Sequence, residues 1–346
     1  MIIKGIAASL PERRVTNEEV IDLVRYHSAK GFTGDLDRTL RIILHLLKRT
    51  GLIERRICDR HESPLDHVAV AVREAMSRSY LRRQHIDLLI YVGVGRGFIE
   101  PGNSHMIASA LGFHKAQCFD VVDACMSWVR GMDMVDSFFK SGKYSNALII
   151  NAEFHSIEAG PNFPGCLTLR NADEIPYRFS TYTIGDAATA TILFPKDPDN
   201  FETHYSSRPE LAKLCTLPVK GFEEFCHPEP EIGKSGVMQF TAYGEELHRH
   251  VEVESKLLFN SLKNSRDVDV LFVHASSFSE WDKHARAVGM GDKVFQIYPH
   301  TGNLVSASIP TAISMAQAQG RLERGNRVGV WVASAGMSFA YSRFRY

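Results

Sequence analysis

The sequence predicts a layered α/β fold made of two similar halves, and three observations lead to this prediction. Apolar strand-like segments alternate with amphipathic helical segments, the pattern of helices packed on sheets. A helix, a basic glycine turn and a strand occur in the same order in both halves, which indicates a duplication. The 346 residues, 44% of them hydrophobic, suffice for two half-domains around a shared core.

The first copy is predicted from four segments in chain order. Residues 87–93 have the composition of an interior strand, and residues 137–142 end a helix with a glycine. Residues 147–150 then supply another strand, and the glycine-led apolar segment 185–194 completes the copy. We expect residues 151–182, between these last two strands, to be an insertion over a cavity between the halves.

The second copy repeats this order near the end of the chain. A helix from about residue 306 to 319 is followed by a basic turn, the strand 328–332 and the glycine-led segment 336–341. We therefore predict a pseudo-twofold axis between an N-terminal half, residues 1–194, and a C-terminal half, residues 195–346. Cys125 and Asn303 would then occupy similar places, each just ahead of its copy's helix, and face one cavity.

Composition excludes several classes of partner and site. Lys plus Arg and Asp plus Glu number 40 each, so no global field attracts nucleic acid. The apolar N-terminus is too short for a signal peptide and no window suits a membrane span, so we expect a cytoplasmic protein. Six cysteines occur without C-x-x-C pairs or metal-ligand spacing, which predicts free thiols and no metal site.

Cys125 is the first candidate for covalent catalysis. It lies between a short β-branched run and the first turn of an apolar-periodic helix. The free N–H groups of a helix start can lower a thiol pKa from about 8.5 by roughly one unit or more, which increases the nucleophilic thiolate. The alternative is a small apolar residue packed under a strand, which is the commoner fate of a single cysteine.

Four segments together resemble the ketoacyl synthase III branch of the thiolase superfamily. Residues 120–150 resemble its nucleophile strand, helix and following strand, and Gly185-Asp186-Ala187 resembles its glycine turn. Residues 273–277 resemble its histidine segment, and residues 300–310 its asparagine segment. The resemblance implies a homodimer with the thiolase-like fold, αβαβα layers and a triad of Cys125, His274 and Asn303.

The chemistry of acyl transfer gives an independent reason for these residue types. A thiolate accepts the acyl group, and neutral donors such as His274 and Asn303 stabilise an enolate oxygen without a trapping charge. Taken alone, His274 would be a core histidine and Asn303 a turn residue. The resemblance also implies an oxyanion hole formed by the backbone N–H groups of Cys125 and Ala335, where the family has glycines.

Glu100, in the segment Gly97–Pro101, shifts the resemblance towards the olefin-forming head-to-head condensing enzymes. In that branch a glutamate before proline reaches across the dimer into the partner's site and acts as the base. An unactivated acyl thioester must lose an α-proton to form a carbanion, and this step requires a positioned base, for which burial would raise the pKa. The alternative is a capping or solvated loop glutamate.

Carrier recognition is expected at two arginines, with no tightly bound cofactor. Arg49 and Arg178 resemble the family's nucleotide contacts, although about His45 stands in place of its stacking tryptophan. Coenzyme A and acyl carrier protein both remain open as carriers. Four aromatic residues are candidates for an acyl channel, with ordinary core as the alternative: Phe98, Trp128, Phe154 and Phe163.

The sequence thus predicts an acyltransferase of lipid or secondary-metabolite biosynthesis. It would form an acyl-Cys125 thioester and join it to a second acyl thioester by Claisen condensation, without decarboxylation. Three alternatives remain: decarboxylative extension of a malonyl thioester, acyl transfer to an alcohol or amine, and a non-catalytic partner subunit.

Overall fold

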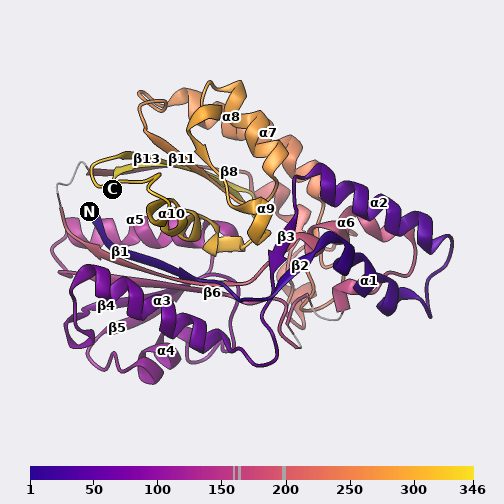
Figure 1. Ribbon diagram of the computed structural model, residues 1–346, viewed down its shortest axis with the longest axis horizontal. Helices are drawn as coiled ribbons and strands as arrows, with labels where there is room; N and C mark the ends of the chain where they lie inside the picture. The colour runs from indigo at the N-terminus through magenta and orange to yellow at the C-terminus, as the bar shows by residue number, and fades with distance from the viewer. Residues whose placement is uncertain (159, 163–164, 197–199) are drawn as a thin grey trace.

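The computed structural model describes residues 1–158, 160–162, 165–196 and 200–346, and it confirms the predicted layered α/β fold (Figure 1). Two five-stranded sheets form the framework, in the strand orders β1-β7-β6-β4-β5 and β12-β11-β13-β14-β8. The strands are β1 (Ile2–Ser9), β4 (Leu88–Val92), β5 (Gln117–Val121), β6 (Ala147–Glu153), β7 (Ala187–Phe194), β8 (Phe201–Ser207), β11 (Val270–Val273), β12 (Val294–Phe295), β13 (Arg327–Ser334) and β14 (Ser338–Arg345).

The two sheets have the same topology, which confirms the duplication. In the first sheet β4 is parallel to β5 and β6, and β7 runs antiparallel between β6 and β1. In the second sheet β11 is parallel to β12 and β13, and β14 runs antiparallel between β13 and β8. The strands of the first sheet lie within residues 1–194 and those of the second within residues 195–346.

Helices form the other layers (Figure 1). Helices α5 and α10 lie between the sheets, α3 and α4 cover the outer side of the first sheet, and α7 and α8 cover that of the second. Their bounds are α3 (Pro64–Ser79), α4 (Asn103–Leu111), α5 (Ser127–Lys140), α7 (Gly244–Ser261), α8 (Phe278–Ala287) and α10 (Ser308–Ala318). Strands β4, β6 and β11 are buried along their whole length because helices cover both faces of these sheets.

Helices α1 and α2 pack against each other and project from one end of the molecule beside α6 (Figure 1). Each begins at a side-chain cap: Thr16 accepts from Glu19 N–H before α1, and Asp35 from Arg38 N–H before α2. The remaining α-helices and strands are α1 (Asn17–Ser28), α2 (Leu36–Arg49), α6 (Ile175–Arg178), α9 (Tyr298–Thr301), β2 (Arg14–Thr16), β3 (Glu54–Arg56), β9 (Cys215–Thr216) and β10 (Thr241–Ala242).

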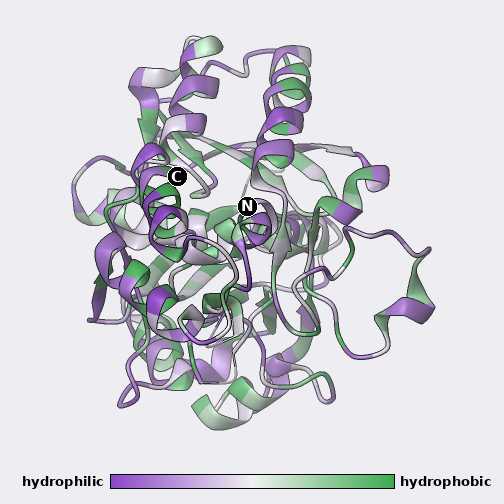
Figure 2. Ribbon diagram, turned by 90° about the vertical axis from the view of Figure 1, so that its right-hand side faces the viewer, coloured by the Kyte–Doolittle hydropathy of each residue, from purple (hydrophilic) through white to green (hydrophobic). Residues whose placement is uncertain are grey.

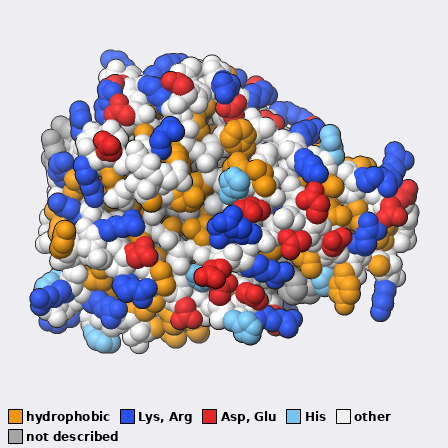
Figure 3. Space-filling model, in the orientation of Figure 1, with side chains coloured by type: hydrophobic (Ala, Val, Ile, Leu, Met, Phe, Trp, Pro, Cys, Tyr) orange, Lys and Arg blue, Asp and Glu red, His pale blue; other side chains and the backbone are white. Residues whose placement is uncertain are grey.

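Hydrophobic residues concentrate on the strands, and the outer helices carry many hydrophilic ones (Figure 2). Figure 3 shows basic and acidic side chains scattered together over one face, in keeping with the equal numbers of each. Within the described residues, no helix has both the length and the apolar composition that a membrane crossing requires.

Candidate active site

Cys125 lies in a 3₁₀ turn, Ala124–Met126, between β5 and α5. Ala124 has φ 44°, in the left-handed region that costs a non-glycine residue about 1–3 kcal/mol. Two bonds to the end of β13 hold the turn: Met126 N–H donates to Ser334 Oγ at 3.2 Å, and Ser334 Oγ donates to the Asp123 carbonyl at 3.3 Å. The second half of the chain therefore positions Cys125, the predicted nucleophile, in the first half.

A matching turn precedes α10 in the second copy. The 3₁₀ turn Val305–Ala307 also begins with a left-handed residue, because Val305 has φ 50°. Ser306 thus takes the place of Cys125 in the duplication. Our expectation that Asn303 is the counterpart of Cys125 is wrong by three residues, since the turn before the helix was not visible in the sequence. The two turns contact each other between the sheets.

The thiol of Cys125 does not have the lowered pKa that a helix start suggested. Burial raises its pKa well above the usual value, and Cys215, Glu153 and Asp123 add to the rise. The carboxyl groups and the apolar surroundings disfavour a thiolate more than the helix start favours one. Cys125 is therefore a neutral thiol, and for it to act as the predicted nucleophile a base would have to take its proton during attack.

His274 directly follows β11, beside the end of β13. Its N–H donates to the Trp331 carbonyl at 3.1 Å, its side chain is buried, and its Nδ1 has no hydrogen-bond partner among the described residues. Burial, with a contribution from His248, lowers the pKa of His274 to about 3. The imidazole is therefore neutral at physiological pH, the form that can accept a proton from a thiol or donate one N–H to an oxygen.

Asn303 is held by backbone on both sides. Its N–H donates to the Thr183 carbonyl at 2.8 Å, and its carbonyl accepts from Gly185 N–H at 3.0 Å. Its side-chain Oδ1 accepts from Val305 N–H at 2.9 Å, so the NH₂ group is the part of the amide left to donate. Only glycine fits at position 185, where the two backbone segments meet, because a Cβ there would lie 2.1 Å from the Thr301 carbonyl oxygen.

Ala335 follows β13 directly after Ser334, which binds the turn of Cys125. The neighbouring Gly336 has a positive φ of 126°, whereas the φ of Ala335 is not positive. An alanine therefore fits at position 335 without the glycine-only backbone that the family's glycine run suggested.

A buried polar network beneath the two turns was missed by the sequence analysis. Glu153 accepts hydrogen bonds from Ser306 Oγ and, at 2.7 Å, from Gly95 N–H, and its Oε2 lies 2.9 Å from Nε2 of His155. Burial acts to raise the pKa of Glu153, but the bonds from His155 and Ser306 lower it overall. Gly93 leaves room for this network, because a Cβ would lie 2.5 Å from the Glu153 carboxylate. Polar residues at the end of the buried strand 147–150 were the available signal.

Asp186, from the glycine turn, ties the insertion to the first sheet. Its carboxylate accepts from the backbone N–H groups of Cys58 and His155, each at 2.9 Å, and from the Ser156 hydroxyl. Asp186 thus supports the segment that carries His155.

Glu100 lies on an exposed loop between β4 and α4. The two residues before it also face solvent, with Phe98 45% and Ile99 81% exposed. Asn103 Oδ1 holds the loop by accepting from Phe98 N–H at 3.1 Å. The carboxylate therefore lies on an exposed loop of the single chain and not in a buried site.

The two arginines expected to bind a carrier have different surroundings. Arg49 is exposed at the end of α2. Arg178 is 6% exposed, donates to the carbonyls of Gly165 at 3.1 Å and Ser235 at 3.4 Å, and pairs with Glu174 at 3.4 Å. Internal contacts thus occupy the Arg178 guanidinium, which favours a structural role over the predicted nucleotide contact.

We expect Arg178→Met to lower the free energy of unfolding by about 3 kcal/mol, because it leaves the buried Glu174 carboxylate unpaired. Arg49→Met is the matched control and should change stability by less than about 0.5 kcal/mol. Urea unfolding followed by circular dichroism measures both. An Arg178→Met variant with wild-type stability and a raised KM for an acyl thioester would restore the nucleotide-binding role.

The acyl-channel assignment is not supported for two of its aromatic residues. Trp128 and Phe154 belong to the hydrophobic core, and Trp128 Nε1 donates to Thr191 Oγ1 at 3.1 Å. Both are therefore ordinary core residues. Phe98 is the exposed residue near Glu100, and Phe163 lies outside the described residues.

Comparison with known proteins identifies relatives along nearly the whole chain. The family described as 3-oxoacyl-(acyl-carrier-protein) synthase III matches residues 119–209, and the family for the C-terminal part of that enzyme matches residues 260–346. A β-ketoacyl-(acyl-carrier-protein) synthase III from Symbiobacterium thermophilum is 27% identical over 350 residues, covering 99% of this chain and 97% of its own.

Solved structures of OleA from Xanthomonas campestris share the fold. A variant changed at one glutamate aligns with TM-score 0.82 and 20% identity, over 99% of this chain and 97% of its own. A variant changed at one cysteine, solved with lauric acid and lauroyl-CoA, aligns with TM-score 0.81 and 20% identity, over 99% and 98%.

Proposed function

The chain is a ketoacyl synthase III-like condensing enzyme of the thiolase superfamily, and from this premise we propose that it joins two acyl thioesters through an acyl-Cys125 intermediate without decarboxylation. Acyl transfer is the chemistry of the class. The nucleophile, the base and the donor carbanion assigned below are our proposal for this chain.

In the first step Cys125 attacks the carbonyl carbon of an acyl thioester. The new carbon–sulfur bond forms as the carrier thiolate leaves, and the thiol proton passes to His274. The neutral imidazole of His274 supports this transfer, because a ring whose pKa is lowered to about 3 keeps one N–H and leaves its other nitrogen free to accept the proton. The backbone N–H groups of Cys125 and Ala335 would bind the oxyanion.

In the second step Glu100 of the partner subunit removes an α-proton from a second acyl thioester. The enolate attacks the acyl carbon, the Cys125 thiolate leaves, and a β-ketoacyl thioester forms. The amide NH₂ of Asn303 and the N–H of His274 would donate to the enolate oxygen.

The main observation in support of Glu100 as a base for the partner subunit is its exposed position. Its loop stands beside β5, which forms an edge of the first sheet and leads directly to the Cys125 turn. Apolar side chains surround this edge: Phe98 and Ile99 are exposed, and Val122 is 59% exposed. An exposed strand edge with apolar neighbours favours pairing with a second copy, which would carry Glu100 towards the partner's Cys125.

We also propose that the carrier is coenzyme A, with a phosphate contact from Arg49. Its exposed guanidinium at the end of α2 supports this assignment, as does the lauroyl-CoA bound to a structural relative. The cytoplasmic location remains a prediction.

Decarboxylative use of a malonyl thioester is the second candidate, because the relatives are named β-ketoacyl-(acyl-carrier-protein) synthase III. Incubation of the wild-type enzyme with lauroyl-CoA, with and without malonyl-CoA, separates the two. We expect a β-ketoacyl product from lauroyl-CoA alone, with no release of carbon dioxide. A product that forms only with malonyl-CoA, one carbon dioxide for each bond, would contradict the proposal.

A further inference from the structure

Three imidazole nitrogens on the outer helices of the second sheet have no hydrogen-bond partner among the described residues. They are Nδ1 of His248 on α7 and both ring nitrogens of His284 on α8, and all three are buried. His284 is 1% exposed. A buried polar atom without a partner costs about 1–3 kcal/mol, so such atoms call for an explanation.

The same two histidines lie around one carboxylate. One ligand atom from each of His248, Glu280 and His284 lies within 4.8 Å of the other two. Glu280 and His284 are four residues apart on α8, so they share one face of the helix, and His248 comes from the neighbouring α7. Helices α7 and α8 contact each other along this face.

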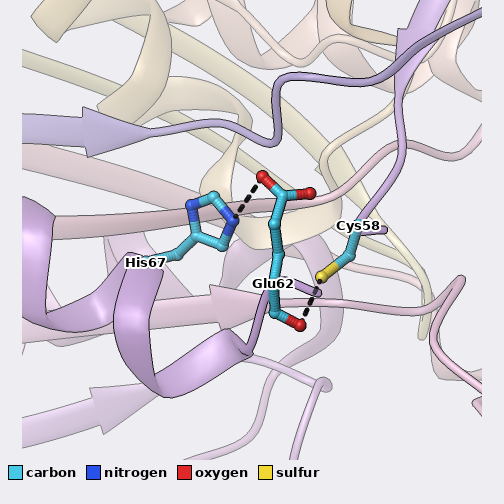
Figure 4. A group of neighbouring side chains, drawn as sticks. All are labelled: Cys58, Glu62 and His67. Atoms are coloured by element: carbon cyan, nitrogen blue, oxygen red, sulfur yellow. Dashed lines mark hydrogen bonds and ion pairs between the residues drawn. The ribbon is translucent and has the colours of Figure 1, made fainter. Parts of the chain in front are cut away.

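A second group with metal-ligand chemistry, Cys58, Glu62 and His67, differs because its polar atoms are already paired (Figure 4). The His67 ring bonds Ser9 Oγ through Nδ1 at 2.8 Å and pairs with Glu62 through Nε2 at 3.4 Å. The Cys58 thiol donates to the carbonyls of Asp59 and Glu62. Hydrogen bonds within the fold explain this group without a ligand.

We propose that His248, Glu280 and His284 bind one zinc ion. Two imidazoles and one carboxylate are a common ligand set for Zn²⁺, and water would complete a tetrahedral site. Coordination would give one ring nitrogen of His284, and one of His248, a partner that the fold does not supply. The sequence predicted no metal site because it lacks closely spaced Cys and His ligands, whereas these ligands come from helices about thirty residues apart.

The position of the site indicates a bracing role. Ser277, three residues after His274, caps the start of α8 because its hydroxyl accepts from Glu280 N–H. An ion bridging α7 and α8 would fix the start of α8 and so steady the segment that carries His274. This proposal does not depend on the condensation mechanism, because zinc binding is measured without substrate.

The test is a zinc titration of untagged, chelator-treated protein in competition with a chromogenic chelator. We expect one tight equivalent per chain, a raised melting temperature with zinc, and loss of that equivalent in His248→Ala and His284→Ala. Glu280→Gln should weaken binding by about tenfold or more. It keeps the size of the side chain and serves as the folded variant should a histidine variant not fold.

Two controls address other histidines. His250 lies two residues after His248 on α7, so it faces the opposite side of the helix. His67 belongs to the group of Cys58, Glu62 and His67, whose polar atoms are already hydrogen-bonded. His250→Ala and His67→Ala should therefore both still bind one equivalent of zinc. The proposal is overturned by a wild-type protein that binds no stoichiometric zinc, or by His284→Ala and Glu280→Gln variants that bind it as tightly as wild type.

Discussion

Replacing Cys125 with alanine is expected to abolish the covalent acyl-enzyme and to lower condensation by at least about a thousandfold. No other thiol lies in the turn that the ends of β5 and β13 hold in place. Removal of one methyl-sized polar group from this site should leave the fold intact. Intact-protein mass after incubation with lauroyl-CoA measures the effect: one lauroyl adduct on wild type and none on the variant.

Cys215→Ala is the matched control for this experiment. Cys215 is close enough to influence the pKa of Cys125, but it lies on β9 and not in the turn between β5 and α5 that Ser334 holds in place. We expect this variant to acquire the lauroyl adduct as wild type does. An adduct on the Cys125→Ala protein, or an adduct lost from the Cys215→Ala protein, would place the nucleophile elsewhere.

The protonation states predict how acylation depends on pH. His274 becomes positively charged only near its lowered pKa of about 3, so the imidazole that we propose as the base remains neutral throughout the neutral range. Because the pKa of Cys125 is raised, the proposed mechanism requires the thiol to give up its proton during attack and not beforehand. A site built on a preformed thiolate would instead combine a lowered thiol pKa with a protonated histidine.

Much of the fold was predictable because the hydrophobic periodicity of strands and helices, and the glycines that end helices, are visible in short stretches of sequence. The strands predicted at residues 87–93, 147–150 and 328–332 are β4, β6 and β13, each slightly different in length. The helices predicted to end before Gly142 and Gly320 are α5 and α10, and both glycines have positive φ, as helix stops require.

The parts that could not be predicted depend on contacts between distant residues. The bond from Met126 to Ser334 and the place of Ser306 opposite Cys125 arise only when the two halves pack. The pKa of Cys125 follows from burial and from Glu153, neither of which a helix-start pattern contains. The outward loop of Glu100 was likewise a question of placement, since a glutamate before proline fits many loops.

Glu100→Gln is expected to lower malonyl-independent condensation by about a hundredfold or more while Cys125 is acylated at the wild-type rate. The amide keeps the shape of the carboxylate but cannot accept the α-proton of the second substrate. The solvent-exposed Glu12→Gln is a control that should leave both steps unchanged. Loss of acylation in Glu100→Gln would contradict a role confined to the second step, and unchanged condensation would exclude Glu100 as the base.

The most direct test of the central claim measures condensation by hybrid dimers, purified through two different affinity tags. One hybrid pairs a Cys125→Ala chain with a Glu100→Gln chain, and the other pairs wild type with the double variant. If Glu100 serves the partner's Cys125, the first hybrid should show about half the activity of wild-type dimers, because one of its two sites is complete, and the second should be inactive. The reverse pattern, or failure of any hybrid dimer to form, would contradict the account.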